Sequence, residues 1–90
     1  MSDRHTLHPS QIVMYTTQYC PDCHRAKKFF ELHNIPYFNI GLEGNHEATE
    51  FVMQVNGGFR SVPTIVFPDG SILVEPGWED RWREFHRPAR

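Results

Sequence analysis

Two cysteines three positions apart are the residues of this sequence best suited to chemistry. They stand in the segment Cys20-Pro21-Asp22-Cys23 and are the only cysteines among the 90 residues. Two cysteines are too few for the disulfide scaffold of a secreted mini-protein. In a reducing compartment, a pair at this spacing is usually a reactive dithiol or part of a metal site, and the neighbouring segments help to decide which.

The segments around the pair predict a buried strand, a short loop and a helix. Gln11–Thr16 reads QIVMYT, which is typical of a strand buried on both faces. After the short loop Thr17–Tyr19, Pro21 suits the first position of a helix, where its missing N–H needs no partner. We therefore expect Cys20 to cap the helix and Cys23 to lie in its first turn, with Pro21 stiffening that turn.

A sulfur at the start of a helix is favoured as an anion. The unpaired N–H groups and the helix dipole both stabilise negative charge there, so the pKa of the Cys20 thiol falls. At an ordinary thiol pKa of about 8.5, only about 3% of the sulfur is ionised at pH 7, and a lower pKa increases that fraction. The gain in nucleophile is partly offset because a less basic thiolate is intrinsically less reactive.

The spacing predicts different roles for the two sulfurs. Cys23 is close enough to attack a mixed disulfide on Cys20, so Cys20 is the exposed attacking residue and Cys23 the buried resolving one. Lys27 and Lys28 add positive potential further along the helix. Asp22 opposes the thiolate if its carboxylate approaches Cys20.

Three other interpretations of the pair stay open. Both cysteines can be inert members of the core. A zinc site needs two further ligands, and His24, His46 and His86 are available, but the sequence has no second Cys-x-x-Cys and no His-x₃₋₅-His pair. Residues 20–24 also match the c-type haem motif Cys-x-x-Cys-His, which belongs to exported proteins. We expect no bound metal, and His24 to lie on the surface of the first helix.

A second informative segment is Val62-Pro63, directly ahead of an apolar strand. A proline at this place removes a backbone donor from the edge of a sheet. If the Val62–Pro63 bond is cis, the chain turns sharply and leaves the N–H and C=O of Val62 unpaired. Those two groups can then pair with a peptide-like substrate as a short extra strand.

The whole chain predicts an α/β fold with the order β-α-β-α-β-β-α. Strands are expected at 11–16, 37–40, 64–67 and 71–74, and helices start at Cys20–Pro21, after the capping residue Asn45, and around Trp78, Trp82 and Phe85. Pro68-Asp69-Gly70 marks a hairpin. The first two strands form a parallel unit and the hairpin adds antiparallel strands, which gives a four-stranded mixed sheet with helices on both faces.

Composition limits the partners and the compartment. The balance of 9 Lys+Arg against 11 Asp+Glu gives a net charge of −2, which disfavours nucleic acid and anionic membranes. No apolar run approaches the ~20 residues that span a bilayer, and residues 1–9 lack the apolar stretch of a secretory signal. We expect a cytoplasmic monomer with one domain at 11–87 and short tails at 1–10 and 88–90.

Together the two segments resemble the glutaredoxin family of the thioredoxin fold. The resemblance rests on Cys20-Pro21-Asp22-Cys23 after IVMYT and on Ser61-Val62-Pro63 ahead of TIVF, and it runs from about Ile12 to Phe85. Residues 51–63 and the hairpin at 68–71 are similar to the mycoredoxin subgroup.

The resemblance implies a thiol–disulfide oxidoreductase that acts on protein disulfides or on mixed disulfides between proteins and small thiols. It implies that Val62–Pro63 is cis, with Pro63 packed against the cysteine pair. The residues that it places at the substrate thiol are Tyr19, Pro21, Arg60, Ser61, Val62 and Pro63. No bound cofactor is implied: electrons come from a low-molecular-weight thiol, glutathione or mycothiol, or from a flavoprotein reductase, and disulfide-containing proteins are the clients.

The sequence departs from glutathione-using members at three places. Those members usually carry a Lys before the first Cys, an Arg or Gln early in the second helix, and Gly-Gly-x-Asp at the last helix. Here Thr17, Glu50 and Glu75–Trp78 stand in those regions, and Arg60 is the well-placed cation. Because glutathione carries two carboxylates that cations would hold, the identity of the thiol stays open.

A second class of function fits the same residues. In a redox-responsive binding module, the cysteine pair switches the docking of a partner through the surface around Trp78 and Trp82 or through the polar tail. Sustained turnover of a small disulfide distinguishes the enzyme from a switch, which reacts once per molecule.

Overall fold

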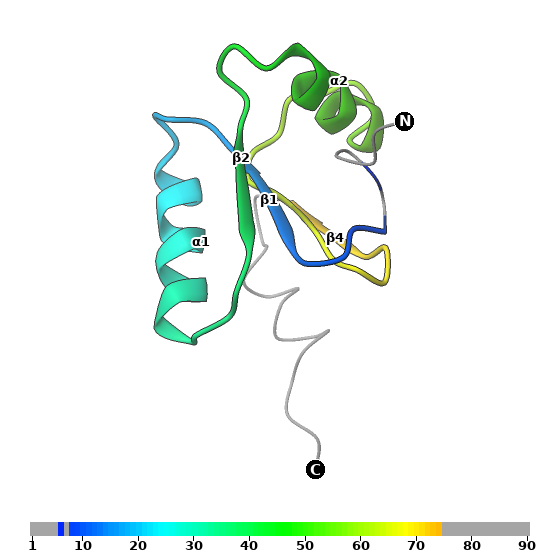
Figure 1. Cartoon of the computed structure of the whole chain (residues 1–90). Coiled ribbons are helices and arrows are strands. Elements are labelled where there is room, and N and C mark those ends of the chain that lie inside the picture. The colour runs from blue at the N-terminus through cyan, green and yellow to red at the C-terminus, as the bar shows by residue number, and fades with distance from the viewer. Residues whose placement is uncertain (1–5, 7, 75–90) are drawn as a thin grey trace.

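Four strands form one mixed sheet, with a helix after each of the first two strands (Figure 1). The computed structural model describes Thr6 and residues 8–74. Its elements are β1 (Val13–Thr16), α1 (Pro21–Leu32), β2 (Phe38–Gly41), α2 (His46–Val55), β3 (Thr64–Val66) and β4 (Ile72–Val74). The strand order is β2-β1-β3-β4, with β1 parallel to β2 and antiparallel to β3, and β3 antiparallel to β4.

The described elements confirm the predicted β-α-β-α-β-β order and the mixed sheet. β1 starts two residues later than predicted, β2 is shifted by one residue, and β3 and β4 are each one residue shorter than predicted. The predicted closing helix around Trp78, Trp82 and Phe85 lies outside the described residues, as does most of each predicted tail.

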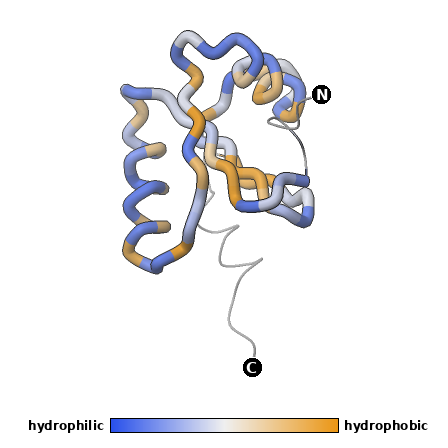
Figure 2. Tube along the Cα trace, viewed as in Figure 1, coloured by the Kyte–Doolittle hydropathy of each residue, from blue (hydrophilic) through white to orange (hydrophobic). Residues whose placement is uncertain are grey.

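The two helices cover opposite faces of the sheet. All four residues of β1 are buried, and successive side chains of a strand point to opposite faces. Val13 and Tyr15 pack with the α2 residues Phe51 and Val52, while Met14 packs in a second cluster with Phe30 of α1. Figure 2 shows hydrophobic colour gathered on the central strands and hydrophilic colour along much of α1. The burial of Val13–Thr16 between the two helices confirms the prediction of a strand buried on both faces, whereas Gln11 in the predicted range is exposed.

Both helices follow the capping residues that the sequence predicts. Cys20 caps α1 in extended conformation, and Asn34 follows its end with a φ of 56°, a value that Asn tolerates better than most residues. Asn45 caps α2, where its side-chain oxygen accepts from the N–H of Ala48 at 3.1 Å. Gly57, with a φ of 67°, follows the end of α2.

The sheet register brings two chain segments together at one end. Because β1 runs antiparallel to β3, the end of β1 lies beside the start of β3, with Tyr15 opposite Thr64. The loop that leaves β1 leads to Cys20, and the loop that enters β3 contains Val62 and Pro63. These two loops therefore lie at the same end of the sheet, although 42 positions of sequence separate Cys20 from Val62.

Among residues 6 and 8–74, no helix has the length and apolar character that crossing a bilayer requires.

The cap of α2 yields a stability prediction. Asn45→Ala removes the acceptor for the Ala48 N–H and lowers the free energy of unfolding by about 1 kcal/mol in chemical denaturation. Asn45→Asp keeps a capping oxygen and is the matched control, with stability close to that of the wild type. Equal stability of the Ala variant and the wild type would contradict the capping role.

Candidate active site

The sulfur of Cys20 lies at the start of α1, where backbone amides point towards it. Cys20 is the N-cap residue, with a φ of −124° and a ψ of 104°, and its Sγ accepts from the backbone N–H of Cys23 at 3.0 Å. Pro21 occupies the first helical position, which spares one donor that would have no partner. The helix start therefore supplies the sulfur with a hydrogen bond and the positive end of the dipole.

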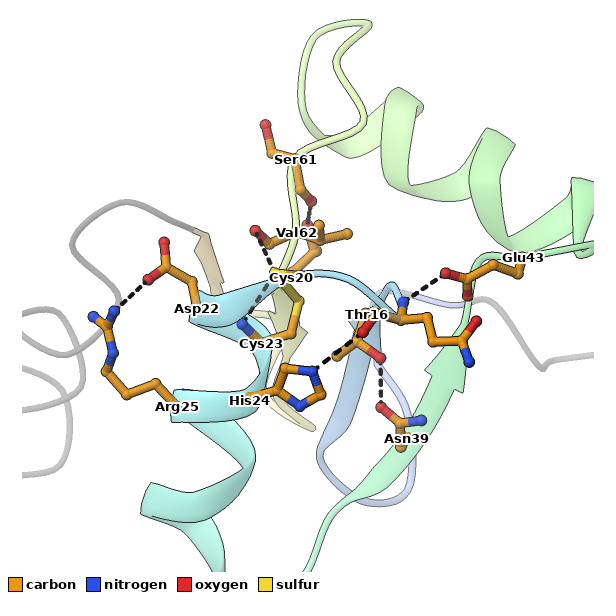
Figure 3. The surroundings of a disulfide bond; sticks show 12 residues. Thr16, Cys20, Asp22, Cys23, His24, Arg25, Asn39, Glu43, Ser61 and Val62 are labelled. Atoms are coloured by element: carbon orange, nitrogen blue, oxygen red, sulfur yellow. Dashed lines mark hydrogen bonds and ion pairs between the residues drawn. A yellow bond between two sulfur atoms is a disulfide. The ribbon is translucent and has the colours of Figure 1, made fainter.

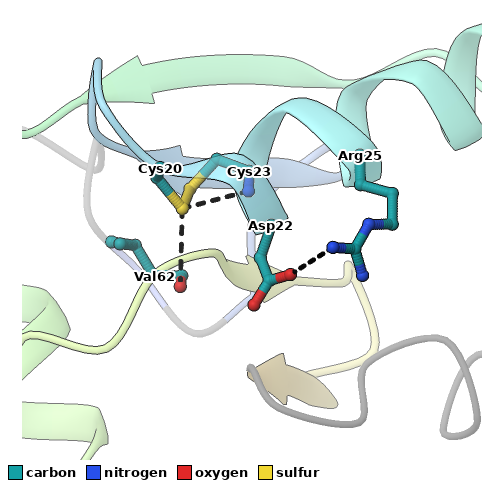
Figure 4. Close-up of polar contacts among 5 residues, drawn as sticks. All are labelled: Cys20, Asp22, Cys23, Arg25 and Val62. Carbon is teal, nitrogen blue, oxygen red and sulfur yellow. Dashed lines mark hydrogen bonds and ion pairs between the residues drawn. A yellow bond between two sulfur atoms is a disulfide. The ribbon is translucent and has the colours of Figure 1, made fainter.

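The two cysteines form a disulfide with their Cα atoms 5.2 Å apart (Figure 4). Cys23 is fully buried, whereas 8% of the surface of Cys20 stays exposed. Only Cys20 is thus open to a sulfur that approaches from solvent. This difference favours the predicted division between an attacking and a resolving residue.

The carboxylate of Asp22 is engaged by a neighbour rather than by the sulfur. Arg25 Nη2 lies 3.1 Å from Asp22 Oδ1, one helical turn along α1, and Figure 4 shows this pair beside the disulfide. The Arg25 guanidinium offsets part of the negative charge that Asp22 brings near Cys20. Asp22 therefore disfavours a thiolate at Cys20 less than an unpaired carboxylate would.

Val62, in the other loop, faces the cysteine pair (Figure 3). The Val62–Pro63 bond is cis, as the family resemblance implied. The carbonyl oxygen of Val62 lies 3.8 Å from Cys20 Sγ, within the range in which a reduced thiol can donate to it. Pro63 is buried, while Ser61 and Val62 are half-buried. The structure thus brings Val62 to the reacting sulfur.

The other predicted site residues lie at the surface. Tyr19 is 90% exposed directly before Cys20, and Pro21 and Arg60 are also exposed. Arg60 contributes, with Lys27, a favourable electrostatic interaction to the carboxylate of Glu43. Both cations therefore favour the charged form of the Glu43 carboxylate.

No sequence pattern predicted the contacts that anchor the loop before Cys20. The Glu43 carboxylate accepts from the backbone N–H of Gln18. The carbonyl oxygen of Gln18 lies 3.1 Å from the ring nitrogen Nε2 of His24. The Gln18 N–H is the largest cause that holds the pKa of Glu43 below its ordinary value, and Lys27 and Arg60 contribute less. His24 is exposed on α1, as predicted, and also binds this loop (Figure 3).

The described residues contain no group of three or more His, Cys, Asp or Glu side chains arranged to hold a metal ion.

Comparisons with known proteins decide the family. The family model described as glutaredoxin matches residues 12–72. The chain belongs to the glutaredoxin family. A glutaredoxin-named protein of Mycobacterium tuberculosis is 42% identical over 69 residues, which cover 77% of this chain and 82% of that protein. Mycoredoxin 1 of Corynebacterium glutamicum is 36% identical over 67 residues, covering 74% and 82%.

Solved structures agree with the family. A crystal structure of a thioredoxin-like protein superposes on this glutaredoxin with a TM-score of 0.69 at 25% identity, covering 81% of this chain and 97% of the other. The thioredoxin-like fold expected from the sequence is therefore confirmed. With family, fold and the Cys20–Cys23 pair in agreement, this glutaredoxin is a thiol–disulfide oxidoreductase.

The capping geometry predicts a lowered thiol pKa. In a reduced Cys23→Ser variant, which keeps the backbone N–H at position 23, Cys20 titrates below the ordinary value of about 8.5 when its ultraviolet absorbance is followed. If the pKa of Cys20 is lower in the folded than in the unfolded protein, the thiolate stabilises the reduced fold at pH values above the unfolded pKa. This contribution to the free energy of unfolding is lost as the pH falls through the folded pKa.

The control for this titration is the same variant in denaturant, where the helix start is absent and the ordinary thiol pKa returns. A folded protein that titrates like its denatured form would show that the helix start does not stabilise the anion.

Proposed function

We propose that this glutaredoxin reduces disulfides of client proteins, and mixed disulfides between proteins and small thiols, with Cys20 as the attacking residue. The observation that carries the proposal is the position of Cys20 Sγ, which caps α1, faces Val62 and is more exposed than Cys23. A capped thiolate at the surface attacks an incoming disulfide, whereas a fully buried sulfur does not reach one.

The exchange runs in two displacements. The Cys20 thiolate attacks one sulfur of the client disulfide, a Cys20–client bond forms, and the other client sulfur leaves as a thiolate that takes up a proton. Cys23, once deprotonated, then attacks Cys20 Sγ and displaces the second client thiolate. The client gains two electrons, and the enzyme is left with the Cys20–Cys23 disulfide.

The enzyme is then reduced by an external thiol or by a reductase. Two molecules of a low-molecular-weight thiol return the dithiol and leave as their own disulfide, or a flavoprotein reductase delivers the same two electrons. Similarity to mycoredoxin 1 and the attraction of Lys27 and Arg60 to the carboxylate of Glu43 support mycothiol over glutathione, which carries two carboxylates. Glu43 competes with an anionic thiol for the two cations.

Client recognition uses the backbone of Val62 together with the surface around it. An extended client peptide pairs with the N–H and C=O of Val62 while its sulfur meets Cys20. The binding surface is completed by Tyr19, Pro21, Arg60 and Ser61, while Pro63 is buried directly after Val62 in the chain. We further propose that the protein acts as a monomer in the cytoplasm, where reducing conditions keep a dithiol available for the next client.

Removal of either sulfur has a different result. Cys20→Ser abolishes exchange, because no nucleophile is left at the exposed position. Cys23→Ser keeps the first displacement and accumulates the Cys20–client mixed disulfide, which mass spectrometry detects. Steady-state reduction of a disulfide-bonded peptide, with a thiol supplied as reductant, measures both effects.

Cys20→Ser protein that still turns over the peptide disulfide would overturn the assignment of the nucleophile. The Cys23→Ser protein trapped in extract of its own cells also identifies the natural thiol and client, because each remains joined to Cys20.

A further inference from the structure

The loop at residues 57–63 connects α2 to β3 and carries the Val62 side of the site. Its two ends are joined by a side-chain hydrogen bond. Asn56, the C-cap residue of α2, donates through Nδ2 to Thr64 Oγ1 at 2.9 Å, and Thr64 is the first residue of β3. We refer to this Asn56–Thr64 contact as the loop-base bridge. The bridge joins the end of α2 to the start of β3 and so closes the base of the loop.

The hydroxyl of Thr64 also holds the interior of the loop. Thr64 Oγ1 donates to the carbonyl oxygen of Ser61 at 2.6 Å, so the hydroxyl accepts one hydrogen bond and donates another. Thr64 is fully buried. Because bulk water does not reach this hydroxyl, loss of either bond is not readily made up by solvent.

The bridge is connected to the sulfur of Cys20 through Ser61 and Val62. Ser61 precedes Val62, and the Val62 carbonyl oxygen lies 3.8 Å from Cys20 Sγ. At the other end of the loop, Gly57 and Gly58 have φ values of 67° and 100°, which residues other than glycine rarely adopt. Gly58 and Phe59 bond through their backbone N–H groups to the carbonyl oxygens of Met53 and Asn56, so this end of the loop is held to α2. At its other end, the Ser61 backbone is attached through the hydroxyl of Thr64.

We propose that Asn56 and Thr64 are positioning residues for the exchange reaction. They hold the Ser61–Val62 backbone where an extended client peptide pairs with it, and they touch neither the client nor the sulfur. The inference rests on the proposed function, since it assumes that clients bind along Val62. It predicts that the bridge affects peptide binding and leaves the sulfur chemistry unchanged.

Two substrates separate these effects. Both are mixed disulfides of thionitrobenzoate, one with the cysteine of a short peptide and one with mercaptoethanol, which has no peptide backbone. In a Cys23→Ser background, Cys20 attacks the peptide or mercaptoethanol sulfur and thionitrobenzoate leaves as a coloured thiolate. The dependence of the rate on substrate concentration gives a half-saturating concentration and a maximal rate.

Thr64→Val is the central variant because it keeps the shape of the side chain and removes the hydroxyl. We expect its half-saturating concentration for the peptide substrate to rise about fivefold, which corresponds to the typical net contribution of the one lost hydrogen bond that holds Ser61. Its maximal rate and its rate with the mercaptoethanol substrate stay at the level of the background protein. Thr64→Ser keeps the hydroxyl and restores peptide binding, and Asn56→Ala shifts it in the same direction as Thr64→Val.

A merely structural role gives a different pattern. It lowers thermal stability and affects both substrates alike, and that result would overturn the inference. Unchanged peptide binding in Thr64→Val and in Asn56→Ala would overturn it as well. If the background protein fails to release thionitrobenzoate from either substrate, the proposed function itself fails, so the two failures are distinguishable.

Discussion

One hydrogen bond at the beginning of a helix underlies the chemistry of this protein. The backbone N–H of Cys23 points at the sulfur of Cys20, and that donor exists because Cys20 stands just ahead of the first helical turn. A backbone donor stays in place whichever side chain follows, so the fold itself supplies this hydrogen bond to the sulfur. The rest of the structure serves to aim this helix start and to present a second loop opposite to it.

The opposing loop arrives by sheet topology. In an antiparallel pair, the end of one strand meets the beginning of its partner, and the pairing of Tyr15 with Thr64 fixes that meeting point. Burial of β1 between two helices then makes the register costly to change, since a slip by one residue would turn its side chains to the wrong faces. The distance between Cys20 and Val62 is therefore set by the core of the domain.

Local patterns in the sequence were sufficient to predict the described elements and the pairing of the two cysteines. The order of strands and helices, the caps at Cys20 and Asn45 and the paired cysteines all depend on neighbours within a few positions, which periodicity and spacing reveal. Contacts between distant loops left no such trace. The bond between Glu43 and Gln18 and the one between Asn56 and Thr64 join polar residues that are ordinary in loops and caps, and only the folded chain brings them together.

The complete burial of Cys23 has a consequence for survival under oxidative stress. A peroxide that reaches the partly exposed Cys20 converts it to a sulfenic acid, which further peroxide would carry to irreversible acids. A shielded thiol one helical turn away condenses with the sulfenic acid first and expels water, which leaves the same disulfide that the catalytic cycle already reopens. The arrangement thus turns a damaging oxidation into a recoverable one.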